Sequence, residues 1–403
     1  MSKIRILEEA NLPLEVAILL IAALAMLITG ILLFPVSIGV IPYYENGLYG
    51  LLLFIFAIQI VTIGKTPFGD MSRSMPLIII GTIIASVGIV TCFIPVFLSQ
   101  IPGIMLFIFF TPGGFFLLFR TLLSREKLRS WLKYKGIFNH LIFSSIAVYF
   151  LSILIGLLVL MHNLLNITMT AVVALLFGIL LIYLSFVLWK IYIIYPEAEN
   201  VNKGTVNLSA DKMLLLLTGV FMLILGVLLI PVSLGELPFS GSAQLGLLMI
   251  IFAIQIMSSG STPIGLFPKS WLIIIIGLFF AVLGIISNIV PDILVMPLTI
   301  LIGVLNIAGG IITLTNTFLP LLKKTQNYIG SVPLILKKLF FTQIIMGCLS
   351  ILFGLSMLIS YLIPGLVVGV VLFANGCVLL YLIKILLVID KMRNQNETIK
   401  NTL

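Results

Sequence analysis

One segment of sixteen residues occurs twice in this chain. Residues 54–69 read FIFAIQIVTIGKTPFG and residues 250–265 read IIFAIQIMSSGSTPIG, with ten of the sixteen positions identical at an offset of 196 residues. The same offset relates Pro35 to Pro231 and Gly88 to Gly284, and an offset of 198 relates Gly178 to Gly376. The chain is therefore a tandem duplication, and one basic fold must suit both copies.

The composition of both copies points to a lipid bilayer. Hydrophobic residues make up 61% of the chain and charged residues only 9%, whereas a soluble domain carries roughly 25% charged residues. Backbone groups in hydrocarbon find no water to bond, so each spanning segment must satisfy its own hydrogen bonds as a helix of about 20 apolar residues. The sequence thus predicts a helical membrane protein.

Each copy contains six apolar stretches of spanning length. Those of the first copy are Leu14–Phe34, Leu48–Gly64, Pro76–Val96, Ile104–Leu123, Ile137–Met161 and Ile167–Ile194. Those of the second copy are Met213–Ile230, Leu245–Ser259, Trp271–Val290, Val295–Leu319, Leu339–Leu362 and Gly365–Val388. We therefore expect an all-α, polytopic membrane protein with 12 transmembrane helices.

The distribution of basic residues fixes the expected orientation. With the N-terminus inside, all 22 lysines and arginines fall on the inner side of the twelve spans, as expected for cytoplasmic segments. This predicts a plasma-membrane protein with both termini in the cytoplasm. The net charge of +9 is then a topology signal that also attracts anionic lipid, and no nucleic-acid partner is expected.

An even number of spans per copy gives both halves the same orientation. We expect residues 1–195 to form the first six-helix repeat, 196–212 a cytoplasmic linker, and 213–403 the second repeat with a short cytoplasmic tail. Such parallel repeats are related by a pseudo-twofold axis along the membrane normal. In transporters of this kind the solute site lies between the halves.

A finer pattern suggests that each half consists of three helical hairpins. Pro35 and Pro95 end the first and third predicted helices at their outer ends, and Pro231 and Pro291 occupy the same places in the second copy. Each proline is followed by a short outer loop and a returning apolar helix. The third hairpin of each half keeps the pattern loosely.

These hairpins resemble the HdeD-like acid-resistance membrane proteins. The stretches that carry the resemblance are GILLFP at 30–35, GIVTCFIP at 88–95, GVLLIP at 226–231 and GIISNIVP at 284–291. The resemblance implies a non-enzymatic, stress-associated membrane protein whose molecular activity is undefined. The usual module of that family is a single six-helix unit, whereas this chain is doubled.

No catalytic, cofactor or metal site is expected from the titratable residues. Arg120, Lys190 and Lys384 lie near inner helix ends, where long side chains reach the interface, and no ionisable residue is expected within a span. His140 and His162 fall on opposite sides of the membrane. The cysteines, all in predicted helices, have no metal-ligand spacing; they are Cys92, Cys348 and Cys377.

Gln59 and Gln255 are the candidate site residues, together with Thr66 and Thr262 in the turns that follow. They recur in the shortest span of each half, and short interrupted spans at matching positions point to transporter sites. The other interpretation is that each glutamine bonds a neighbouring helix and each threonine stabilises its turn. The chain is then a transporter of a neutral or amphipathic solute, or a structural or assembly subunit in the membrane.

The predicted topology is testable by cysteine labelling in intact cells. Single cysteines placed in the 35–47 or 231–244 loops should react with a membrane-impermeant maleimide. Cysteines in the 124–136 or 196–212 segments should react only after permeabilisation, because basic segments stay in the cytoplasm. Labelling of the 124–136 segment from outside would contradict the twelve-span topology.

Overall fold

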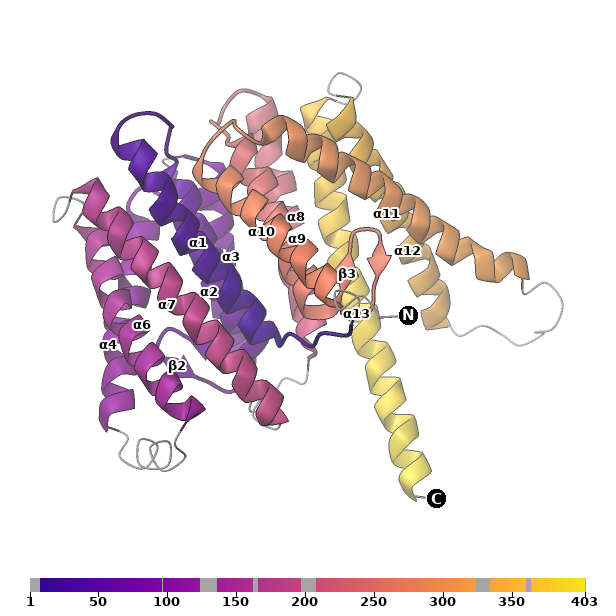
Figure 1. The fold of residues 1–403 in the computed structure, drawn as a ribbon. Coiled ribbons are helices and arrows are strands. Elements are labelled where there is room, and N and C mark those ends of the chain that lie inside the picture. Colours follow the sequence, from indigo (N-terminus) through magenta and orange to yellow (C-terminus); the bar gives the residue numbers. More distant parts are fainter. Residues whose placement is uncertain are drawn as a thin grey trace, which may run out of the picture. The chain divides into compact units, whose positions relative to one another are not determined.

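A computed structural model of the chain describes residues 8–95, 97–123, 136–161, 166–196, 208–323, 334–359 and 364–402. Its helices of the first copy are α1 (Leu14–Ser37), α2 (Glu45–Ile63), α3 (Met75–Phe93), α4 (Ile101–Leu123), α6 (Ile137–Leu160) and α7 (Ile167–Ile194). Those of the second copy are α8 (Ala210–Ser233), α9 (Gly241–Ser259), α10 (Trp271–Ile289), α11 (Val295–Lys323), α12 (Leu334–Leu358) and α13 (Gly365–Thr402). Figure 1 shows these helices in sequence colours.

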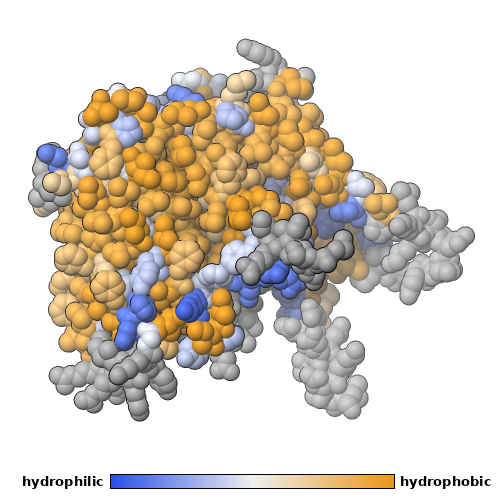
Figure 2. All heavy atoms as spheres, in the orientation of Figure 1, coloured by the Kyte–Doolittle hydropathy of each residue, from blue (hydrophilic) through white to orange (hydrophobic). Residues whose placement is uncertain are grey.

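The prediction of an all-α protein with twelve spans is confirmed. Within the described residues, twelve helices are long and apolar enough to cross a membrane. Apolar side chains cover most of the surface drawn in Figure 2, so that surface suits contact with lipid tails. Residues 124–135 of the predicted inner loop, 197–207 of the predicted linker, and His162 lie outside the described residues.

The helices form two compact units that do not follow the two sequence copies. One unit contains the helices of the first copy together with α9 and α10, and the other contains α8, α11, α12 and α13. In the first unit, the α9–α10 pair of the second copy packs against α1, α2 and α3. This unit therefore contains contacts between helices of the first and second copies.

The closest helix pairs differ from the hairpins expected from the prolines. In the first copy, α1 packs most extensively on α7, α2 on α3, and α4 on α6. The loops after Pro35 and Pro95 instead join α1 to α2 and α3 to α4, which share much smaller contacts. The prolines mark helix ends, but the extensive packing of α2 on α3 and of α4 on α6 is made between helices joined by the other connections.

Glycines explain which helices approach closely. A Cβ atom on Gly88 of α3 would lie 2.7 Å from the carbonyl oxygen of Gly50 and 3.0 Å from the amide nitrogen of Phe54 in α2. A Cβ atom on Gly178 of α7 would lie 2.6 Å from the amide nitrogen of Leu27 in α1. Between membrane helices, association depends on such close van der Waals packing, so these glycines select the pairs.

The second copy repeats this arrangement. Cβ atoms on Gly246 of α9 and Gly284 of α10 would each lie 2.6 Å from the other glycine's carbonyl oxygen. In the second unit, a Cβ atom on Gly376 of α13 would lie 2.7 Å from the amide nitrogen of Leu223 in α8. The pair of α8 and α13 thus corresponds to that of α1 and α7.

Two reciprocal hydrogen bonds join the α2–α3 and α9–α10 pairs. The Tyr44 amide donates to the Ile289 carbonyl at 2.8 Å, and the Ser240 amide donates to the Phe93 carbonyl at 2.9 Å. An offset of 196 carries Tyr44 onto Ser240 and Phe93 onto Ile289. Contacts exchanged in this way are the property of a twofold interface, so the two pairs are related by a pseudo-twofold axis.

Short hairpins follow the second helix of each copy. Strands β1 (Lys65–Thr66) and β2 (Gly69–Asp70) pair antiparallel, with Lys65 opposite Asp70. Strands β3 (Ser261–Thr262) and β4 (Gly265–Leu266) form the corresponding pair. Gly64 ends α2 with a φ of 72°, a left-handed conformation that glycine adopts without steric cost. The first hairpin brings Lys65 and Asp70 to the end of the helix bundle.

We expect Gly88→Ala to destabilise the protein. The added methyl group would press on the backbone of α2, and such overpacking costs about 1–3 kcal/mol. Thermal unfolding in detergent, followed by circular dichroism, measures the change. Gly103→Ala in α4 is the matched control, because its Cβ atom would lie 3.8 Å from the nearest side chain. Equal stability of the two variants would contradict close α2–α3 packing.

Candidate functional site

A cavity of about 380 Å³ lies within the first unit and is lined only by residues of the first copy. Its walls come from α1, α2, α4, α6 and α7 and from the β1–β2 hairpin. Its volume is in the range of pockets that bind small molecules. The glycine-mediated helix pairs therefore leave one space between them that is large enough for a solute.

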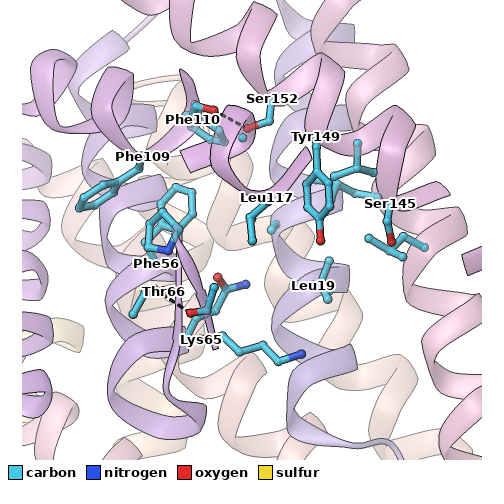
Figure 3. Close-up of a pocket in the computed structure, with 18 of the residues that line it drawn as sticks. Leu19, Phe56, Lys65, Thr66, Phe109, Phe110, Leu117, Ser145, Tyr149 and Ser152 are labelled. Carbon is cyan, nitrogen blue, oxygen red and sulfur yellow. Dashed lines mark hydrogen bonds between the residues drawn. The ribbon is translucent and has the colours of Figure 1, made fainter. Parts of the chain in front are cut away.

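One end of the cavity is apolar and aromatic. Phe56 of α2 contacts Phe109 and Phe110 of α4, with ring centroids 5.4 and 5.2 Å apart. Phe110 also contacts Phe177 of α7 at 6.1 Å. Ser152 of α6 donates a hydrogen bond of 2.9 Å to the Phe110 carbonyl, so its hydroxyl is satisfied by the backbone. Figure 3 shows Phe109, Phe110 and the Ser152 hydrogen bond above Phe56.

The other end is charged. Glu15 begins α1, Lys65 and Asp70 lie in the β1–β2 hairpin, and Arg120 lies in the last turn of α4. The four side chains come from four elements and carry two negative and two positive charges. A charged end with no formal net charge suits a neutral or zwitterionic group better than an ion of one sign.

Glu15 is a cavity residue that the sequence did not predict. Glu15 is 7% exposed. It is the second residue of α1, a helix long enough to cross a membrane. Its carboxylate pairs with the Lys65 ammonium and accepts a hydrogen bond of 2.6 Å from the Tyr192 hydroxyl. A buried carboxylate needs such partners, and these three residues tie α1, α7 and the β1–β2 hairpin together.

Three polar side chains of the cavity are available to a ligand. Among the described residues, Gln59, Asp70 and Arg120 make no side-chain hydrogen bond or ion pair with the protein, although all three line the cavity. The Arg120 guanidinium lies against Gly69, where a Cβ atom would collide with it. Tyr149 and Ser145 of α6 also line the space, and Figure 3 shows Leu19 below the Tyr149 ring.

Two of the four predicted site residues line the cavity and two do not. Gln59 and Thr66 line the cavity, whereas Gln255 and Thr262 do not. Thr66 donates to the Gly69 carbonyl at 2.7 Å and Thr262 to the Gly265 carbonyl at 2.8 Å. These bonds hold the two turns, which is the structural role considered for the threonines. Whether either glutamine acts on a solute stays a prediction.

The repeat pattern does not point to the charged residues of the cavity, because most of them are not shared by both copies. At an offset of 196, Lys65 corresponds to Ser261, Asp70 to Leu266 and Arg120 to Asn316. Glu15 alone keeps an acidic counterpart, Asp211. A charge that occurs in only one copy is not needed for the shared helix packing. Such charges are therefore a sequence signal for a site specific to that copy.

No protein-family model, curated protein or solved structure matches this chain. The function is therefore inferred from the cavity and its residues.

We expect Lys65→Met to destabilise the protein by about 1–3 kcal/mol, because the buried Glu15 carboxylate would keep only the Tyr192 hydroxyl. Adding Glu15→Gln should recover part of the loss, since the neutral amide needs no counter-charge. Thermal unfolding without added solute measures both effects. Lys190→Met, at an exposed position of α7, is the control, and an equal effect there would contradict a structural role of the Glu15–Lys65 pair.

Proposed function

We propose that this protein is a non-enzymatic transporter of the plasma membrane, and that its first repeat binds a small amphipathic solute with a zwitterionic or neutral head group. The observation that supports this is the cavity with an aromatic end and a charge-balanced end. Solute pockets combine apolar walls with a few convergent polar groups. The aromatic end would take the apolar part of the solute.

The head group would lie between Arg120 and Asp70. An arginine binds a carboxylate or phosphate through two parallel hydrogen bonds, and the Asp70 carboxylate would accept a hydrogen bond from an amine. Gln59 offers both a donor and an acceptor. Glu15 and Lys65 already pair with each other, and this pair would stabilise the charged end of the cavity.

The charged end of the cavity faces the cytoplasm in the proposed topology. It lies where α1 begins and where α2 and α4 end, which places all four charges on the side rich in basic residues. Such segments remain in the cytoplasm. The described arrangement would then be an inward-open state that takes up or releases solute there.

The alternatives from the sequence are supported differently. A purely structural or assembly subunit has no need of a cavity with an aromatic end and a charge-balanced end, so transport is favoured. This cavity lies within the first repeat, and the expectation of a site between the halves remains untested. The HdeD-like resemblance and the association with stress remain predictions that the cavity neither requires nor opposes.

Binding of defined amphiphiles tests the proposal. Full-length protein in nanodiscs should bind hexylphosphoethanolamine, which carries both charges, more tightly than hexyl phosphate or hexylamine. Arg120→Gln should weaken this binding roughly 10- to 100-fold, because a hydrogen bond to a charged group is lost. Gln59→Leu should weaken it by roughly 5- to 10-fold. Equilibrium dialysis measures the affinities.

Gln255→Leu is the matched control, since it makes the same substitution at the duplicated position outside the cavity. Its affinity for hexylphosphoethanolamine should equal that of the wild type. Equal weakening by Gln59→Leu and Gln255→Leu would contradict a site in the first repeat. If the protein binds the compound but does not carry it into proteoliposomes, the protein is a binding protein and the proposal of a transporter is wrong.

A further inference from the structure

A second hollow lies between α12 and α13 in the other unit. This groove, of about 560 Å³, is lined on α12 by Lys337, Lys338, Phe341 and Ile345, and on α13 by Val378 and Tyr381 among others. Lys337, Phe341 and Ile345 follow one another at intervals of four residues, so they lie along one helix face, and Lys338 lies beside them. Phe341 is 62% exposed, which shows that the apolar wall is open to its surroundings.

The charges of this groove have one sign. Lys337 and Lys338 are the fourth and fifth residues of α12 and are exposed. They make no ion pair with any residue that the structure describes, and the described lining contains no carboxylate. Two neighbouring ammonium groups above an apolar wall complement an anion that carries a hydrocarbon chain.

The α12 wall of the groove is nearly as long as the hydrocarbon of one membrane leaflet is thick. Ile345 lies eight residues beyond Lys337, or about 12 Å along a helix that rises 1.5 Å per residue. Half of the hydrocarbon core is about 15 Å thick. With the lysines at the cytoplasmic head-group level, the wall formed by Phe341, Ile345 and Val378 lies beside the first part of an acyl chain.

The first copy has a hydrogen bond at the corresponding place. At an offset of 198, Lys337 corresponds to Asn139, Lys338 to His140 and Tyr381 to Tyr183. The His140 imidazole nitrogen Nδ1 and the Tyr183 hydroxyl form a hydrogen bond of 2.7 Å that joins α6 to α7. In the second copy, Lys338 and Tyr381 both line the groove. The two copies have therefore diverged at this position.

We propose that the α12–α13 groove binds an anionic phospholipid of the cytoplasmic leaflet. The phosphate of the head group lies between the Lys337 and Lys338 ammonium groups, and one acyl chain lies along Phe341, Ile345 and Val378. Basic pockets between transmembrane helices on the cytoplasmic side bind anionic lipid head groups in this way. The site is independent of the cavity in the first repeat.

The test replaces both lysines by their counterparts in the first copy, Lys337→Asn with Lys338→His. Full-length protein is titrated with phosphatidylglycerol and phosphatidylcholine of equal chain length, and bound lipid is counted by native mass spectrometry. The wild type should retain phosphatidylglycerol preferentially. The double variant should bind it roughly 10- to 30-fold more weakly, because two cations facing the head group are removed.

Two further variants keep the result interpretable. Lys190→Gln with Lys391→Gln removes the same charge from exposed helix positions outside the groove and should leave phosphatidylglycerol binding unchanged. Val378→Trp fills the apolar part, keeps both lysines, and should weaken binding. Equal retention of the two lipids by the wild type, or equal loss in the control variant, would overturn the proposal. So would a protein dimer that Val378→Trp dissociates, since the groove would then hold a second copy.

Discussion

Close approach of helix backbones at glycines is the constraint on which this structure depends. Lipid tails are as apolar as leucine, so burial of apolar side chains gives these helices no net attraction to one another. Contact must come from surfaces that fit, and a glycine removes the side chain that would keep two backbones apart. Gly50 and Gly88 in one pair, and Gly246 and Gly284 in its duplicate, show this contact at equivalent places. Helix pairing, the cavity and the groove all follow from which backbones can touch.

The duplication preserves this framework and varies what lies between the helices. The glycines recur in both copies, whereas Lys65, Asp70 and Arg120 occur in the first only. The second copy has Lys338 where the first has His140, which bonds Tyr183, and Lys338 lines a groove. Residues that decide packing have thus been kept, and residues that decide what can bind have changed.

The sequence was sufficient to predict the class and number of helices, because a bilayer accepts few other solutions for so apolar a chain. It did not predict helix partners: the position of Gly178 shows that a backbone approaches closely, but not that the partner is α1. Gln59 was found because both copies share it. Glu15 was overlooked because it stands at the first turn of an apolar stretch, and only the fold brings Lys65 and Tyr192 to its carboxylate.

The reciprocal hydrogen bonds between Tyr44 and Ile289 and between Ser240 and Phe93 have an evolutionary consequence. Two identical six-helix chains could form the same interface as a homodimer, but every mutation would then appear on both sides of the axis. Joining the copies in one polypeptide removes that coupling, since a codon changed in one half leaves the other untouched. An ancestral symmetric dimer could thereby become an asymmetric protein in which each half acquires its own ligand.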